Sequence, residues 1–151
     1  AIIVLIAASA SASINKGRWR AHRGDTGLVW FDSDLGRFGF PNRSPYAAAK
    51  WGVIGFTKSL AIELGDAGVR VNAICPGSVA GPRIDAVYAN KARLRGVAPS
   101  VVRDEALAKT SLKRLVAADD IAHLIVFLAS PLGRNISGQA LPVDADTHAL
   151  V

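Results

Sequence analysis

Short apolar runs and longer stretches of helical periodicity alternate along this chain. The runs at Leu28–Phe31, Val69–Cys75 and Gln139–Val143 have the length and the β-branched or aromatic content of buried strands. Between them, apolar residues recur at helical spacing from Pro45 to Leu64 and again over Asp119–Leu128. Strands separated by helices at this interval predict parallel βαβ units, and therefore an α/β fold.

The segment Ser78–Thr110 departs from this alternation. It mixes polar and apolar residues, and glycine and proline interrupt it. Two short helices are predicted within it, at Ala86–Leu94 and Ser100–Ala108. Because a helical insertion after a strand end can cover a ligand site, we expect this segment to act as a lid.

The first 26 residues are harder to place. Ala1–Ala12 is apolar and then small, and it is too short for a bilayer span, which needs about 20 apolar residues. It has the character of a signal-peptide core but lacks the basic segment that precedes one, so we expect a buried strand or a helix end. Asn15–Thr26 is polar, basic and glycine-punctuated, which is typical of a loop.

The stretch Ser44–Lys50 holds the candidate chemistry. Ser44 is a good helix N-cap and Pro45 suits the first helical turn, so Tyr46 and Lys50 lie four apart on one helix face. A phenol has an unperturbed pKa of about 10. A neighbouring ammonium and the positive helix N-terminus both favour the phenolate, which indicates a general acid/base pair. The plainer interpretation is a packing aromatic and a solvated lysine.

Two longer stretches carry a family resemblance. Tyr46–Gly77 reads YAAAKWGVIGFTKSLAIELGDAGVRVNAICPG, and Asp119–Asp144 reads DDIAHLIVFLASPLGRNISGQALPVD. Both resemble the short-chain dehydrogenase/reductase family, whose motifs follow in order and spacing from about Leu28 onward. The resemblance implies the C-terminal catalytic half of a Rossmann-like, doubly wound parallel sheet. It also implies an oxidoreductase that interconverts a secondary alcohol and a ketone with NAD or NADP.

Roles for three catalytic residues follow from the resemblance. Ser33 lies thirteen residues before Tyr46, the spacing of the family's catalytic serine, and its hydroxyl would polarise the substrate carbonyl. Tyr46 would exchange a proton with the substrate oxygen. Lys50 would favour the phenolate and hold the ribose of the nicotinamide.

The cofactor contacts implied by the resemblance are Tyr46, Lys50 and a loop after the second strand. In that loop, Pro76, Gly77 and Val79 resemble the family segment whose backbone contacts the nicotinamide. Glycine permits close approach of the backbone and proline restricts the turn. The family often has a threonine two residues after the valine, where this chain has Gly81.

Another set of serines competes with Ser33. Ser9, Ser11 and Ser13 also follow an apolar run, but using one of them would require a loop of more than thirty residues before Tyr46. Asp32 and Asp34 flank Ser33 with negative charge, which would oppose an oxyanion. We favour Ser33, with a plain turn serine as the alternative.

The chain also lacks parts of the family pattern. No glycine-rich strand–turn–helix fingerprint is found, and residues 1–26 offer no match for the family's catalytic asparagine. Asp144-Ala145-Asp146 stands where the family commonly has Asp-Gly-Gly. We therefore expect a fragment, with residues 1–27 outside the resemblance and residues 28–151 forming the catalytic half of one domain. Alone, it is expected to show little dehydrogenase activity.

Composition adds few constraints. The formal net charge is +6, but basic residues gather only at Lys16–Arg23 and no nucleic-acid motif is found. The single cysteine, Cys75, excludes an internal disulfide and fits a reducing compartment, so a cytoplasmic location is expected. The three histidines lack the spacing of metal ligands, and no metal site is predicted.

Partners are predicted from the resemblance as well. It implies a small-molecule alcohol or carbonyl substrate and a homo-oligomer, a dimer or tetramer, built partly from the Tyr46–Leu64 helix. Neither a nucleic acid nor a membrane is predicted as a partner. A second hypothesis is a non-catalytic truncated remnant that retains only the oligomerisation surface. A third is anion or nucleic-acid binding through Lys16–Arg23.

Overall fold

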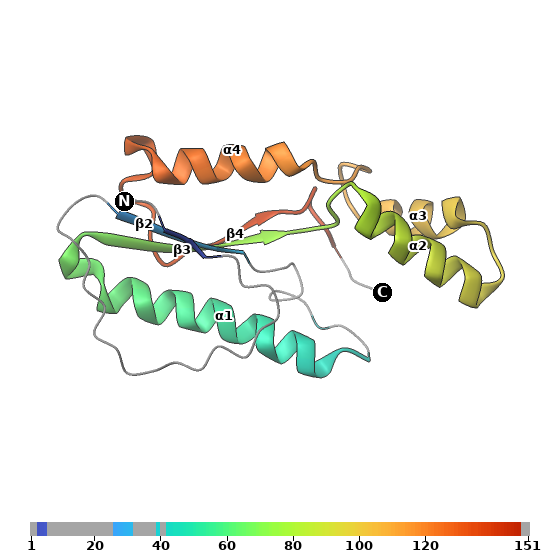
Figure 1. Ribbon diagram of the computed structural model, residues 1–151, viewed down its shortest axis with the longest axis horizontal. Coiled ribbons are helices and arrows are strands. Elements are labelled where there is room, and N and C mark those ends of the chain that lie inside the picture. Colours follow the sequence, from blue (N-terminus) through green and yellow to red (C-terminus); the bar gives the residue numbers. More distant parts are fainter. Residues whose placement is uncertain (1–2, 6–25, 32–38, 40–41, 149–151) are drawn as a thin grey trace.

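A computed structural model describes residues 3–5, 26–31, 39 and 42–148 of the chain. Its elements follow one another as strands and helices of an α/β fold (Figure 1). In chain order they are β1 (Ile3–Leu5), β2 (Thr26–Phe31), α1 (Ser44–Glu63), the 3-10 helix η2 (Gly65–Ala67), β3 (Val69–Pro76), α2 (Pro82–Arg95), α3 (Pro99–Ala108), α4 (Ala118–Ala129), the 3-10 helix η3 (Pro131–Gly133) and β4 (Ala140–Val143).

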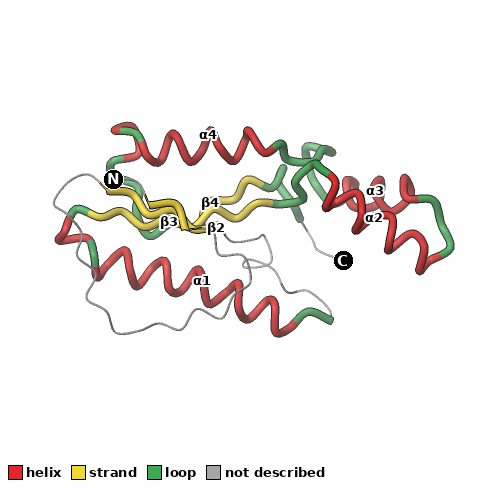
Figure 2. Tube along the Cα trace, viewed as in Figure 1, coloured by secondary structure: helices red, strands yellow, loops and turns green. Residues whose placement is uncertain are grey.

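The described strands form one parallel sheet in the order β1-β2-β3-β4. Trp30 of β2 pairs with Ala73 of β3, and Ile74 of β3 pairs with Leu141 of β4. Figure 2 shows α1 on one face of this sheet and α4 on the other. Because helices cover both faces, β3 is buried along nearly its whole length, including the polar residues Arg70 and Asn72.

Two clusters of buried side chains hold these layers together. On the α1 side, Leu60 packs with Val69 and Val71 of β3. On the α4 side, the buried members are Ile74, Val116, Ile121 and Leu128. Successive residues of β3 therefore serve opposite layers, as the pleat of a strand requires.

Helices α2 and α3 form a hairpin that extends beyond the carboxyl ends of β3 and β4 (Figure 1). It has a buried cluster of its own, made of Tyr88, Ala92 and Val102. Val79, which precedes α2, forms a β-bridge with Val116, which follows α3. The α2–α3 hairpin thus has internal packing and a separate attachment to the sheet.

The predicted fold class is confirmed, and the differences lie at element boundaries. Helix α2 starts at Pro82, four residues before the predicted start, because proline suits the first helical turn. Ser44 is not the N-cap of α1. The first helical bond runs from the Ala47 N–H to the Arg43 carbonyl at 2.9 Å, so Arg43 takes that position and Ser44 is helical. None of the helices in the described ranges is long and apolar enough to traverse a bilayer.

One buried cation joins β3 to the end of α4. The Arg70 side chain is 7% exposed, and its guanidinium donates to the carbonyls of Leu128 at 2.5 Å and Gly133 at 2.8 Å. These are carbonyls at and beyond the helix C-terminus, where orphan acceptors need donors and a positive charge is favourable. Gly133 is required there, since an added Cβ would lie 2.8 Å from the Leu128 Cα.

Arg70→Leu is expected to lower the free energy of unfolding by about 2–4 kcal/mol, because two buried carbonyls lose a charged donor. Urea denaturation followed by circular dichroism measures this loss. Arg134→Leu is the matched control, because Arg134 is exposed. Equal stability of the two variants would contradict the role of Arg70.

A surface ion pair links the two helices of the hairpin. Arg95 of α2 meets Glu105 of α3 in a bidentate contact, at 2.5 and 2.8 Å. The hydrogen bonds from Arg95 lower the pKa of the Glu105 carboxyl. The hydrogen bonds to Glu105 in turn raise the pKa of the Arg95 guanidinium. Because the pair is exposed, solvent and salt screen it.

The pair should give the hairpin a pH dependence with a defined sign. A carboxylate whose pKa is lowered on folding contributes stability above its unfolded pKa, about 4.3, and that contribution is lost as the pH falls through the folded pKa. The melting temperature of Glu105→Gln should lie below that of the unaltered chain at pH 7 and converge with it at lower pH. Asp104→Asn, next to it on α3, should show no such convergence.

Candidate functional site

Tyr46 and Lys50 lie on one face of α1, as the sequence predicts. Tyr46 is in the first turn and Lys50 one turn later, and both side chains are half-buried. The Lys50 Nζ lies 5.6 Å from the centre of the Tyr46 ring, within reach of a favourable cation–π contact. The ammonium therefore lies against the Tyr46 ring.

The start of α1 lies on the side of the sheet where β3 and β4 end. Figure 1 shows its N-terminal end on the same side as the ends of β3 and β4 that lead toward α2 and the C-terminus. Ligands of open parallel sheets bind beyond the carboxyl ends of the strands. Ala49, which is three residues after Tyr46 and one before Lys50, is small and exposed.

The loop after β3 is held against the end of β4. The Gly77 N–H donates to the Val143 carbonyl at 3.0 Å, and an added Cβ on Gly77 would lie 2.8 Å from the Asp144 Cα. The close approach expected for Gly77 is therefore made, at least in part, to protein backbone. Val79 packs against the cluster of Ile74. The Ser78 carbonyl accepts the Val116 N–H at 3.0 Å, so two backbone groups of the Pro76–Val79 segment already have partners within the protein.

Ser33 lies outside the described residues, as do Ser9, Ser11 and Ser13. What the structure describes is the strand that leads to Ser33: β2 ends at Phe31, which pairs with Ile74 of β3. Since Ile74 precedes Pro76 by two residues, the ends of β2 and β3 are adjacent. The choice among the serines stays a prediction, as does the division of the chain at residue 28.

Two cavities among the described residues have volumes of about 310 and 400 Å³, and Tyr46 and Lys50 line neither of them. The smaller one lies between the loop after α3 and the end of β4, with Arg114, Asp120 and Asp144 among its lining residues. Within the described ranges, no three His, Cys, Asp or Glu side chains gather as metal ligands would.

Sequence reasoning passed over a polar network at Asp144–His148. Asp144 is buried, and Ala145 and Asp146 both adopt positive φ, 57° and 54°. L-residues with a Cβ rarely take this conformation, and glycine takes it freely. The signal was present in the sequence, because this is the turn where the resemblance implies two glycines.

Comparison with known proteins agrees with this arrangement. The family model described as Enoyl-(Acyl carrier protein) reductase matches residues 5–148. The short-chain reductase protein NovJ of Streptomyces niveus is 38% identical over 128 residues, which cover 85% of this chain and 47% of NovJ.

Solved structures extend the comparison to the fold. A variant of the actinorhodin polyketide ketoreductase with NADPH has a TM-score of 0.74 and 33% identity, covering 82% of this chain and 47% of that one. A 4-hydroxyisoleucine dehydrogenase complexed with NADH has a TM-score of 0.62 and 26% identity, covering 81% and 46%.

The chain spans about half the length of the curated relatives it matches. The family match covers nearly the whole of this chain, residues 5–148. It includes the first turns of α1, where Tyr46 and Lys50 lie, and the parallel sheet beside them. This chain therefore belongs to the short-chain dehydrogenase/reductase family.

Proposed function

We propose that the chain supplies the catalytic half of an NAD(P)-dependent oxidoreductase that interconverts a secondary alcohol and a ketone. The observation that carries this proposal is the Tyr46–Lys50 pair, with its 5.6 Å cation–ring distance at the start of α1. A phenol beside an ammonium can exchange a proton with a substrate oxygen, which ketone reduction and alcohol oxidation both require. A cytoplasmic location is part of the same proposal.

In the reduction direction, the Tyr46 hydroxyl gives its proton to the carbonyl oxygen as that oxygen becomes negative. Lys50 stabilises the resulting phenolate, and Ser33 donates a hydrogen bond to the same oxygen. The nicotinamide cofactor supplies the hydride that the carbonyl carbon accepts. In the oxidation direction, the phenolate of Tyr46 takes the proton of the alcohol.

The residues present fit one end of a dinucleotide. Lys50 and Tyr46 suit the nicotinamide ribose, and the backbone of Pro76, Gly77 and Val79 suits the nicotinamide. The hydrogen bond from Gly77 to the Val143 carbonyl holds this loop in place. A glycine-rich turn for the pyrophosphate is not found in the sequence.

The second candidate is a non-catalytic remnant that retains an oligomerisation surface. The observation that favours it is apolar exposure on α1, where Trp51 is 54% and Ile62 is 83% exposed. Such side chains on one helix suit an interface with another copy. The catalytic proposal includes the same homo-oligomer, so turnover distinguishes the two candidates.

A graft tests the proposal. Residues 28–151 are joined to the dinucleotide-binding half of the actinorhodin polyketide ketoreductase, and oxidation of NADPH is followed with a panel of ketones. Turnover is expected, and Tyr46→Phe should lower kcat by about 10²–10⁴-fold with cofactor binding nearly unchanged, because only the transferable proton is removed. Lys50→Ala should lose both turnover and binding.

Tyr88→Phe is the matched control, because the Tyr88 hydroxyl is buried in the α2–α3 hairpin without a hydrogen-bond partner among the described residues. It should leave kcat unchanged. Retention of most of kcat in Tyr46→Phe would refute the acid/base role. A folded graft without any turnover would favour the remnant.

The serines are distinguished separately. In a graft that carries residues 1–151 in place of residues 28–151, Ser33→Ala should lower kcat by about 10²-fold, the scale of losing one oxyanion donor. Ser9→Ala, Ser11→Ala and Ser13→Ala should stay close to the unsubstituted graft. The reverse ranking would move the catalytic serine to the segment after β1.

A further inference from the structure

The turn after β4 is built around the carboxylate of Asp144. Asp144 is 8% exposed, and its Oδ1 accepts the N–H of Asp146 at 3.0 Å. Its carbonyl accepts the Thr147 hydroxyl at 2.8 Å. Between these contacts, Ala145 and Asp146 hold positive φ, which their Cβ atoms disfavour. The side chain of Asp144 thus maintains a backbone conformation that the residues of the turn would not prefer.

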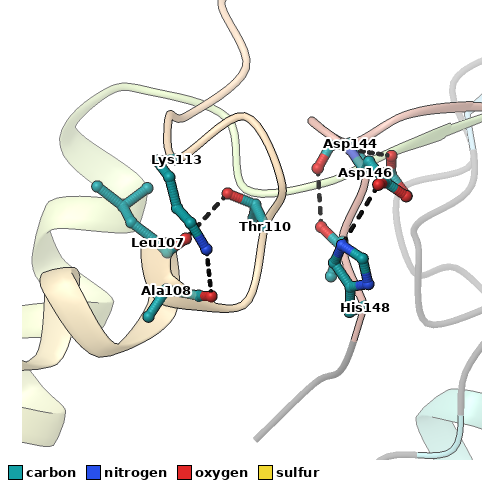
Figure 3. Close-up of polar contacts among 8 residues, drawn as sticks. Leu107, Ala108, Thr110, Lys113, Asp144, Asp146 and His148 are labelled. Atoms are coloured by element: carbon teal, nitrogen blue, oxygen red, sulfur yellow. Dashed lines mark hydrogen bonds and ion pairs between the residues drawn. The ribbon is translucent and has the colours of Figure 1, made fainter.

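This turn supports the segment that leaves the α2–α3 hairpin. We define Lys109–Leu112 as the root of the hairpin. The Ser111 N–H donates to the Asp146 carbonyl at 3.0 Å, the Leu112 N–H to the Ala145 carbonyl at 3.3 Å, and the His148 N–H to the Lys109 carbonyl at 2.9 Å. Figure 3 shows the two sides facing each other, with Thr110 on the root and Asp144, Asp146 and His148 on the turn.

The same residue also supports the loop after β3. Gly77 donates its N–H to Val143, one residue before Asp144, and its Cα packs so closely on the Asp144 backbone that a Cβ would not fit. Asp144 is therefore in contact with the loop proposed to face the cofactor, and it shapes the turn that holds the root. Asp144 and the turn that it shapes therefore contact both the loop after β3 and the root of the hairpin.

We propose that Asp144 is a positioning residue that couples the Pro76–Val79 loop to the root of the α2–α3 hairpin. A displacement of the root stretches its hydrogen bonds to the Ala145 and Asp146 carbonyls and shifts the turn. Asp144 moves with the turn, and Gly77 must adjust because it packs directly against the Asp144 backbone. Movement of the hairpin over a substrate then changes the loop beneath the nicotinamide. The functional meaning of this coupling rests on the proposed function, whereas the coupling itself is a property of the chain.

Amide hydrogen exchange of the 151-residue chain tests the coupling without cofactor or turnover. The reporters are the amides of Ser111 and Leu112 on the root and of Gly77 on the loop. The reference is the amide of Ala73, which donates to the Gln139 carbonyl at 2.8 Å within the sheet. Because no ligand is used, failure of this test and failure of the proposed activity are separate results.

Asp144→Ala is expected to speed exchange at the root and at Gly77 together, by about tenfold, the effect of losing one buried hydrogen bond. Asp144→Asn keeps an acceptor oxygen in place and should restore most of the protection. Thr147→Val removes the hydroxyl that donates to Asp144 and should speed exchange at the same two places to a smaller extent. Asp104→Ala, an exposed carboxylate on α3, should change none of the reporters.

Two results would overturn the proposal. One is faster exchange at Ser111 and Leu112 in Asp144→Ala with Gly77 fully protected, which would mean that the root and the loop are independent. The other is an equal increase at Ala73 and at every reporter, with no recovery in Asp144→Asn, which would mean that Asp144 only adds to global stability.

Discussion

The structure depends on satisfying the buried polar side chains of β3. Arg70 and Asn72 lie on a strand that is covered on both faces, where an unpaired polar group costs about 1–3 kcal/mol. Arg70 donates to the Leu128 and Gly133 carbonyls at and beyond the end of α4. Asn72 donates to the Ile136 carbonyl at 2.9 Å and accepts the Gln139 N–H at 3.1 Å. These bonds place the segment between α4 and β4, and with it the register of β4.

The same strand sets the position of the candidate site. Val71 packs against Leu60 of α1, so the helix that begins with the Tyr46–Lys50 face is fastened to β3 at its other end. The end of β3 continues into Pro76 and Gly77, and β4 ends beside Gly77. Helix α1 with the proposed acid/base pair, the proposed cofactor loop and the turn at Asp144 are all positioned from one buried strand.

The α2–α3 hairpin is joined to this framework in a different way. Its own cluster of Tyr88, Ala92 and Val102 and the Arg95–Glu105 pair hold its two helices to each other. Among the described residues, its connections to the sheet include the Val79–Val116 bridge and the bonds of the root to the turn after Asp144. The packing inside the hairpin is therefore separate from the contacts that attach it to the sheet.

The sequence by itself determined the fold class and the placement of Tyr46 beside Lys50. Both follow from local rules: alternating strand and helix patterns predict a parallel sheet, and a spacing of four residues places Tyr46 and Lys50 on one helix face. Element boundaries were predicted less well, as at Ser44 and Pro82, because a helix can start at any of several adjacent residues that tolerate a free N–H.

Only the tertiary structure decided what Gly77 and Asp144 do. Gly77 can be recognised in the sequence as a residue for close approach, but its neighbour there is Asp144, 67 residues further along the chain. The strained turn at Ala145 and Asp146 becomes understandable only when the root of the hairpin is seen to bond to it. Such contacts join segments far apart in sequence, and no local periodicity or spacing encodes them, because they arise when the sheet brings the ends of its strands together.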